Sequence, residues 1–161
     1  MTSITPFLWF ESQAEEAMNF YVSVFKNSRV LNVSRYGEGG PGPGGSVMLA
    51  TFELNGQQFH ALNGGPEYAG FTETISFYVD CEDQAEVDEL WEKLTADGGQ
   101  PGPCGWLKDR YGLSWQIIPR ALGAMLSDQD AQKSQRVMQA MLKMSKIDVQ
   151  ALEAAYDTVP A

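Results

Sequence analysis

The sequence contains one histidine, His60, and an imidazole is the side chain best suited to acid–base chemistry near neutral pH. It ends the segment Glu53–His60, which is similar to Asp109–Gln116: each has an acid three residues before a glycine and an aromatic residue three after it. Gln116 therefore stands where His60 stands in the other segment, and an amide forms hydrogen bonds but transfers no proton at pH 7. Both side chains can also ligate a metal, the neutral amide only weakly. We predict His60 as a catalytic group; the alternative is a hydrogen-bonded histidine on a sheet.

Three further side chains close to Gln116 favour the binding of a small molecule. Lys108 carries a charge that suits an anion, and the indoles of Trp106 and Trp115 suit stacking on a flat ligand. Each also has a simpler explanation, because lysine is common on exposed strands and tryptophan is common in protein interiors. The predicted ligand-binding residues are Gln116, Trp106, Trp115 and Lys108.

Hydrophobic periodicity divides the first half of the chain into a strand, a helix and three strands. The predicted elements are residues 4–10, 13–25, 30–36, 46–54 and 57–63. Ser12 and Glu15 form a capping-box pattern that marks the start of the helix. Asn55-Gly56 is typical of a type I′ hairpin turn, because both residue types tolerate positive φ. Residues 37–45 contain six glycines and two prolines, which predicts a loop.

The second half repeats this order of elements. Its predicted strands are residues 74–81, 104–109 and 113–118. The helix opens at the capping box Asp83–Glu86 and stops at Gly98-Gly99, and Asp109 is expected to serve the turn of the closing hairpin. The segments Glu11–Glu15 and Glu82–Glu86 match at four of five positions. Because the whole order of elements recurs, and not one motif alone, the pattern indicates an internal duplication.

These elements predict an α+β fold of two βαβββ modules, about residues 1–66 and 71–120, that form a curved mixed sheet with a concave cup. A paired domain over residues 1–120 would be followed by a helical tail over 121–161, lying either on its own domain or on a partner chain. The tail helices are expected at residues 130–144 and 148–156. His60 and Gln116 would face the cup from equivalent positions, and a concave site with a few polar groups is the usual place for a ligand.

Composition excludes several classes of function. The 161 residues carry 11 basic and 21 acidic side chains, for a net charge of −10, which disfavours binding to nucleic acid or to an anionic membrane. No apolar stretch approaches the roughly 20 residues needed to span a bilayer. Cys81 and Cys104 lack metal-binding spacing, and the N-terminal residues lack signal-peptide features. We therefore expect a cytoplasmic protein with reduced thiols.

The chain resembles the vicinal oxygen chelate superfamily, which includes glyoxalase I, extradiol dioxygenases and antibiotic-binding proteins. The resemblance rests on Phe20-Tyr21 in the first helix, on the paired modules, and on the Asp109–Gly112 turn that leads to Trp115-Gln116-Ile117. The PhnB-like branch, often labelled 3-demethylubiquinone-9 3-methyltransferase, is the most similar. Its matching segments are residues 61–66, 80–87, 104–109, 114–119 and 135–141.

The resemblance implies a divalent metal held by up to four residues, two from the opening strands of the modules and two from the closing strands. The closing-strand positions fall on His60 and Gln116. The opening-strand positions fall on Pro6 and on Thr74 or Phe77, none of which is a good ligand. Without a carboxylate or thiolate, little offsets the dehydration of a divalent ion. We expect no cofactor, although the two closing-strand residues leave a divalent metal as an alternative.

The methyltransferase label is not supported by a cofactor motif. Common S-adenosylmethionine enzymes use a glycine-rich turn between a parallel strand and a helix. Here the glycine-rich residues 37–45 lie between predicted antiparallel strands and lead into no helix.

Three functions remain open for the cup. The first is a small-molecule-binding protein or enzyme that works without the full metal site. The second is a metal-dependent isomerase, lyase or dioxygenase, and the third is a non-catalytic protein that sequesters a ligand. The resemblance also implies a homodimer.

Overall fold

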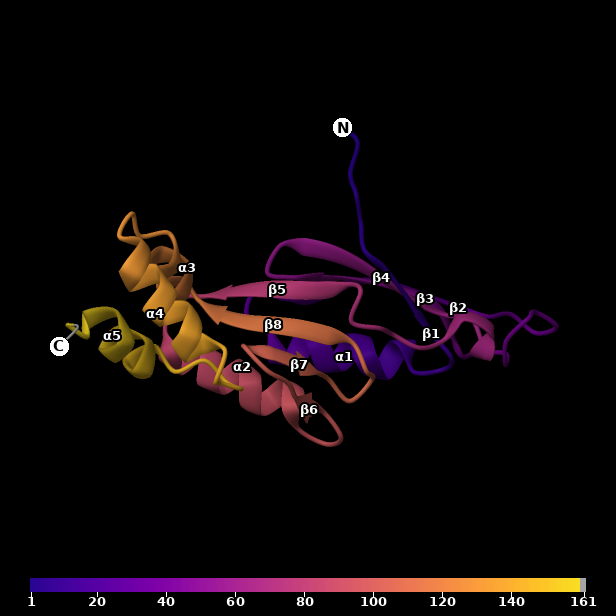
Figure 1. Ribbon diagram of the computed structural model, residues 1–161. Helices are drawn as coiled ribbons and strands as arrows, with labels where there is room; N and C mark the ends of the chain where they lie inside the picture. The colour runs from indigo at the N-terminus through magenta and orange to yellow at the C-terminus, as the bar shows by residue number, and fades with distance from the viewer. Residues whose placement is uncertain (160–161) are drawn as a thin grey trace. The chain divides into compact units, whose positions relative to one another are not determined.

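The computed structural model describes residues 1–159, whose helices and strands fall into two compact units, residues 1–70 and residues 71 onward (Figure 1). No helix among the described residues is long and apolar enough to cross a bilayer.

The first unit is one βαβββ module. It contains β1 (Phe7–Phe10), α1 (Ala14–Val24), β2 (Arg29–Arg35), β3 (Val47–Leu54), β4 (Gln57–Asn63) and a short 3₁₀ turn, η1 (Pro66–Tyr68). The strand order is β1-β4-β3-β2, with β1 parallel to β4 and the other neighbours antiparallel. Asn55 and Gly56 have φ values of 46° and 85°, so the predicted type I′ turn between β3 and β4 is confirmed.

Helix α1 packs on one face of this sheet because its apolar side chains recur at helical spacing. Tyr21 and Phe52 stack with ring centroids 6.3 Å apart, and Phe52 and Phe59 stack at 5.6 Å. Along β4, Phe59 and Ala61 are buried while His60 between them is half-buried, as expected when successive side chains point to opposite faces. We call the face opposite the module's helix the open face of the sheet.

The second unit repeats the module and continues into three helices. It contains β5 (Ser76–Cys81), α2 (Gln84–Thr95), β6 (Gln100–Pro101), β7 (Trp106–Lys108), β8 (Ser114–Pro119), α3 (Arg120–Leu126), α4 (Ala131–Met141) and α5 (Val149–Asp157). Its strand order, β5-β8-β7-β6, is that of the first sheet, again with one parallel pair, β5 and β8. The predicted α+β fold of two βαβββ modules with a helical tail is confirmed. Each module has its own four-stranded sheet, and the shared cup stays a prediction.

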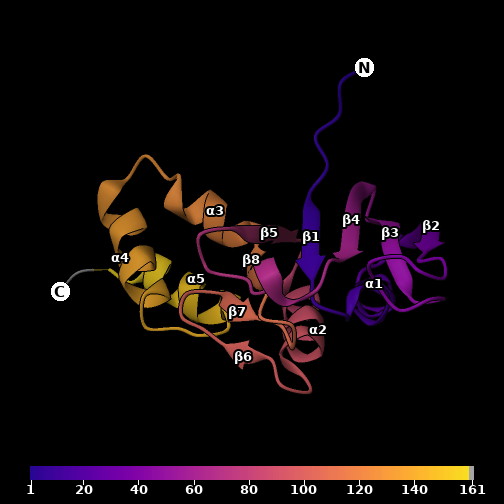
Figure 2. The same cartoon turned by 90° about the vertical axis from the view of Figure 1, so that its right-hand side faces the viewer.

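The tail lies on its own module, the first of the two predicted alternatives. Ile118 at the end of β8 forms a buried cluster with Leu122, Val137, Ile147 and Leu152. Figure 1 and Figure 2 show α3, α4 and α5 gathered beyond the ends of β5 and β8. The side chain of Gln84 at the start of α2 also binds the tail, donating to the Ile147 carbonyl at 3.0 Å and accepting from the Val149 N–H at 2.7 Å.

Two short elements differ from the sequence prediction. Gln100 and Pro101, which lie outside the predicted strands, pair with Lys108 and Leu107 as the edge strand β6. A proline is tolerated there because an edge strand can leave one N–H side unpaired. Helix α3 follows β8 directly and has no side-chain cap, so neither a capping residue nor a long periodic stretch reveals it in the sequence.

The predicted capping box of α1 is wrong, because the helix is capped from another part of the chain. The N-cap residue is Gln13, without a side-chain cap, and the Ser12 N–H bonds the Gln13 amide oxygen. Instead, Asn63 Oδ1 at the end of β4 accepts from the Ala14 N–H at 2.8 Å, and its Nδ2 donates to the Val47 carbonyl at 3.0 Å. The capping box of α2 forms as expected, with Asp83 Oδ1 accepting from the Glu86 N–H at 2.9 Å.

This difference predicts unequal effects of two substitutions at the start of α1. Asn63→Ala removes two side-chain hydrogen bonds and leaves the Ala14 N–H without its acceptor, so it should lower the free energy of unfolding by about 2–3 kcal/mol. Ser12→Ala removes no cap and should change it by less than about 0.5 kcal/mol. Urea unfolding followed by circular dichroism measures both. Equal losses for the two variants would show that Ser12 caps the helix after all.

Candidate functional site

His60 lies on the open face of the first sheet, at the centre of a row across three strands. Its register partners are Phe7 on β1 and Thr51 on β3. The Phe7 ring lies 5.8 Å from the imidazole centroid, and Thr51 Oγ1 is 2.9 Å from His60 Nδ1. This hydrogen bond fixes the ring and leaves Nε2 as the atom through which His60 would meet a ligand.

Gln116 lies on the open face of the second sheet, at the position equivalent to His60. Its register partners are Tyr78 on β5 and Trp106 on β7. Gln116 Nε2 donates to Ser76 Oγ at 2.9 Å, which fixes the orientation of the amide. This row therefore combines two aromatic side chains with one amide, a composition suited to a flat, partly polar ligand.

Trp115 points to the opposite face from Gln116 and belongs to the core. It is 2% exposed, its ring centroid lies 5.5 Å from that of Phe77, and its indole N–H donates to Asp109 Oδ2 at 2.9 Å. Of the two explanations given for Trp115 from the sequence, the structure agrees with the second, a position in the protein interior. The alternation of side chains along β8 is the reason, since Gln116 cannot face the ligand side together with its neighbour.

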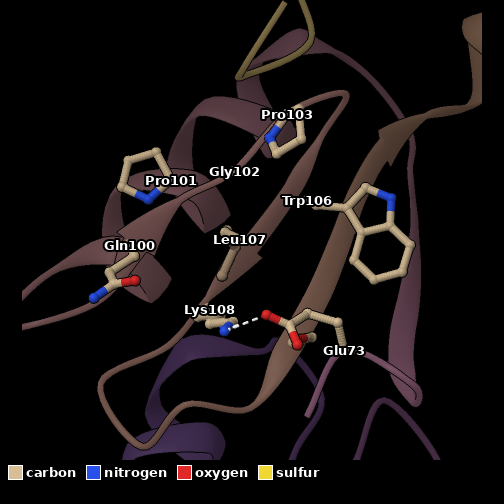
Figure 3. Close-up of a pocket in the computed structure, with 9 residues that line it drawn as sticks. Glu73, Gln100, Pro101, Gly102, Pro103, Trp106, Leu107 and Lys108 are labelled. Atoms are coloured by element: carbon tan, nitrogen blue, oxygen red, sulfur yellow. Dashed lines mark ion pairs between the residues drawn. The ribbon is translucent and has the colours of Figure 1, made fainter. Parts of the chain in front are cut away.

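Trp106 and Lys108 line a pocket of about 500 Å³ in the second unit (Figure 3). The pocket is bordered by Glu73, Gln100, Pro101, Gly102, Pro103, Trp106, Leu107, Lys108 and Ser114. Figure 3 shows the ion pair between Lys108 and Glu73 on one side of it. Hydrogen bonding and charge from Lys108 lower the pKa of Glu73, so this carboxyl group is ionised at neutral pH.

A row of polar side chains crosses all four strands of the second sheet at this pocket. Ser76, Ser114, Lys108 and Gln100 are successive register partners on β5, β8, β7 and β6. Ser114 is 1% exposed, and its Oγ has no hydrogen-bond partner within the described part of the chain. A buried hydroxyl without a partner costs free energy, and such a group at a pocket wall is a recognised sign of a functional site.

Sequence reasoning missed Ser114 and Glu73 as members of this site. The signal for Ser114 was present, since it lies two residues before Gln116 on the same strand and must share its face. No comparable signal exists for Glu73, because it precedes β5 in a turn and reaches Lys108 only through the fold.

The residues beside His60 and Gln116 do not fit a divalent metal. The sequence placed Pro6 and Thr74 or Phe77 at the other two ligand positions. In the structure the register partners on the opening strands are Phe7 for His60 and Tyr78 for Gln116. Phenylalanine has no ligand atom, and burial together with the charges of Asp80 and Cys81 raises the pKa of Tyr78, which keeps its phenol neutral.

Other acidic, histidine and cysteine side chains do not build a metal site either. Among residues 1–159, no three such groups are placed to hold an ion. Cys81 is buried, and burial together with nearby Glu86 and Asp80 raises the pKa of its thiol to about 12. Its thiolate, the form that binds metals and attacks electrophiles, is therefore scarce at neutral pH.

Comparison with known proteins identifies the family. The family model described as 3-demethylubiquinone-9 3-methyltransferase matches residues 2–118. The chain belongs to this family. No curated protein matches the chain.

A solved structure with the same description agrees with this membership, and others are similar at lower identity. A PhnB protein from Bacillus cereus, described as a 3-demethylubiquinone-9 3-methyltransferase, is 43% identical and has a TM-score of 0.67, with 73% of this chain and 99% of that chain covered. A Pseudomonas aeruginosa protein is 20% identical with a TM-score of 0.61, covering 74% and 98% of the two chains, which supports the fold alone. A glyoxylase/bleomycin resistance protein/dioxygenase domain from Frankia is 20% identical over 71% of this chain and 94% of that chain, with a TM-score of 0.43. The predicted resemblance to the PhnB-like branch with its 3-demethylubiquinone-9 3-methyltransferase label is confirmed.

The family's printed name implies S-adenosylmethionine, and the residues of this chain do not fit that cofactor in its common binding mode. Residues 37–45, the glycine-rich segment, join β2 to β3, which pair antiparallel, and no helix follows them. The helix N-terminus that usually lies behind such a turn is therefore missing from this part of the fold.

Asp109 holds the turn that positions Lys108 and Ser114, which leads to a prediction. Its Oδ1 accepts from the N–H groups of Tyr111 and Leu113 at 2.8 and 3.1 Å, while Oδ2 accepts from Trp115. Asp109→Asn turns one acceptor into a donor that faces N–H groups, so it should destabilise the protein by about 2–4 kcal/mol. Asp97→Asn is the control, because Asp97 pairs with Arg110 at the surface and should cost less than about 1 kcal/mol. Denaturant unfolding followed by circular dichroism compares the two variants, and equal losses of stability would show that Asp109 does not hold the turn.

Proposed function

We propose that the protein binds a small organic molecule on the open faces of its modules, without the complete metal site of the superfamily. The observation that carries this proposal is the pocket of the second unit, where Trp106 and Lys108 meet the buried, unpartnered Ser114 hydroxyl. An apolar pocket with a few converging polar groups is the usual form of a small-molecule site. The aromatic residues beside His60 and Gln116 support binding by stacking and hydrogen bonds in place of coordination.

In this proposal Gln116, Trp106 and Lys108 are ligand-binding residues, and His60 is the catalytic residue if the bound molecule is transformed. Supporting His60 is its hydrogen bond to Thr51, which holds the ring and directs Nε2 to the ligand side. A general base must be held in a fixed position within reach of the proton that it removes. That His60 and Gln116 face one cup is part of the proposal.

The superfamily resemblance also leads us to propose a homodimer in the cytoplasm. The edge strands β1 and β5 each carry an exposed aromatic side chain, Phe7 (54% exposed) and Tyr78 (58% exposed). These side chains support a surface for contact with a second chain. The two free thiols, Cys81 and Cys104, support a reducing compartment.

A ligand screen tests the binding proposal. We expect some members of a library of small metabolites to raise the melting temperature of the wild-type protein by several degrees, since ligands that bind only the folded state stabilise it. Trp106→Ala should abolish these shifts, because the indole forms a wall of the pocket. Trp91→Ala on α2 is the matched control and should keep them. A library without hits, or hits unchanged by Trp106→Ala, would refute binding at this pocket.

Metal analysis separates this proposal from a metal-dependent enzyme. We expect purified protein to hold far less than one zinc, nickel, manganese or iron per chain, because His60 and Gln116 offer one imidazole and one weak amide. Inductively coupled plasma mass spectrometry measures the content of wild type and His60→Ala. One metal per chain that disappears in His60→Ala would contradict the proposal and favour the metal-dependent isomerase, lyase or dioxygenase.

A further inference from the structure

From the pocket of the second unit we infer the chemical class of its ligand: a monocarboxylate with a flat apolar body, whose carboxylate binds Lys108 Nζ and Ser114 Oγ. This inference rests on the proposed function and specifies it. It depends on three features of the pocket. They are the Ser114 hydroxyl without a partner among the described residues, the exposed Lys108–Glu73 ion pair that a ligand could replace, and the apolar wall beside Trp106.

The Ser114 hydroxyl requires a partner that the protein does not supply. It is buried and lines the pocket, and its Oγ has no hydrogen-bond partner within residues 1–159. The equivalent neighbour in the same row, Ser76, is already bonded to Gln116. A ligand acceptor in the pocket would satisfy the hydroxyl and recover the cost of its burial.

Lys108 and Ser114 stand side by side, so one group can bind both. They are direct register partners on the antiparallel strands β7 and β8. Side chains at such positions leave the sheet from Cβ atoms about 5 Å apart. A carboxylate has two oxygens that accept from two donors at this spacing, one from the ammonium and one from the hydroxyl.

Glu73 shows that a carboxylate can reach Lys108 at this pocket. Its side chain pairs with Lys108 at the edge of the pocket, while 63% of the Glu73 side chain remains exposed. Exposed ion pairs contribute little to stability, so a ligand carboxylate can replace Glu73 at small cost. The displaced Glu73 would move into solvent, and flexible side chains of the lining would have to move for a ligand to reach the buried Ser114 hydroxyl.

The rest of the lining suits a flat apolar body. Trp106 presents an indole, and Pro101 and Pro103 add apolar rings on the neighbouring segment (Figure 3). Aromatic surfaces of this kind favour a ring stacked on the indole.

A single negative charge on the ligand matches the site. Lys108 is the one cation among the lining residues of this pocket, and the chain carries a net charge of −10. A dianion such as a phosphate would keep one charge unpaired in a field that repels anions.

Isothermal titration calorimetry with matched probes tests the inference. The probes are benzoate, phenylacetate and indole-3-acetate, each compared with its uncharged amide. We expect at least one carboxylate to bind about tenfold more tightly than its amide, the value of one charge-assisted hydrogen bond. Amides that bind as tightly as the acids, or acids that do not bind while other library compounds do, would overturn the ligand class and leave pocket binding intact.

Variants of the three polar residues complete the test. Lys108→Met should weaken carboxylate binding about tenfold and Ser114→Ala several-fold, while Glu73→Gln should strengthen it, because the competing internal carboxylate is removed. Lys93→Met is the control, since Lys93 also forms an ion pair in this unit, with Glu89 on α2, and should have no effect. Wild-type affinity in Lys108→Met, or weaker binding in Glu73→Gln, would contradict the inference.

Discussion

The buried carboxylate of Asp109 is the interaction on which the site of the second unit depends. It accepts from two backbone N–H groups of the β7–β8 turn and from the indole N–H of Trp115. By fixing the turn it fixes the register that pairs Lys108 with Ser114. By holding Trp115 in the core it also decides which side chains of β8 face the ligand side, because the neighbours of an inward residue must point outward.

The duplication explains why the two open faces have the same strand order but carry different side chains. Register places His60 between Phe7 and Thr51, and Gln116 between Tyr78 and Trp106. The hairpin of the second module is one residue longer, and Asp109 fills its turn where the first module has the Asn55-Gly56 turn. Backbone positions are therefore conserved between the copies, whereas the side chains toward a ligand are not. Such a scaffold can change the side chains of its open faces without losing its fold, since these positions lie outside the cores of the modules.

Sequence reasoning recovered nearly all of the fold, because period-2 and period-3.6 patterns and the hairpin turns are local signals. It failed at the start of α1, where the cap comes from Asn63, 49 residues from the N–H that it accepts. The same limit applies to the site. Local spacing indicated Lys108, Trp106 and Gln116, but the pairing of Lys108 with Glu73 depends on tertiary structure. Trp115 could have been assigned to the core by the alternation along its strand, because its neighbour Gln116 was predicted to face the ligand.

Charge in this protein acts over two distances: the net charge acts at long range, and single ion pairs act at contact distance inside the pocket. The overall charge of −10 repels anions at long range, and mobile salt screens that repulsion within about 8–10 Å. Inside a pocket, local geometry dominates, because contact distances are shorter than the screening length and water is partly excluded. The Lys108–Glu73 pair is an example. Although the protein is acidic overall, the ammonium group of Lys108 holds a carboxylate at the pocket because the two groups are in direct contact. If the pocket binds a carboxylate as proposed, affinity would depend on that lysine and on the hydroxyl beside it, and the surface charge would set only how often an anion arrives.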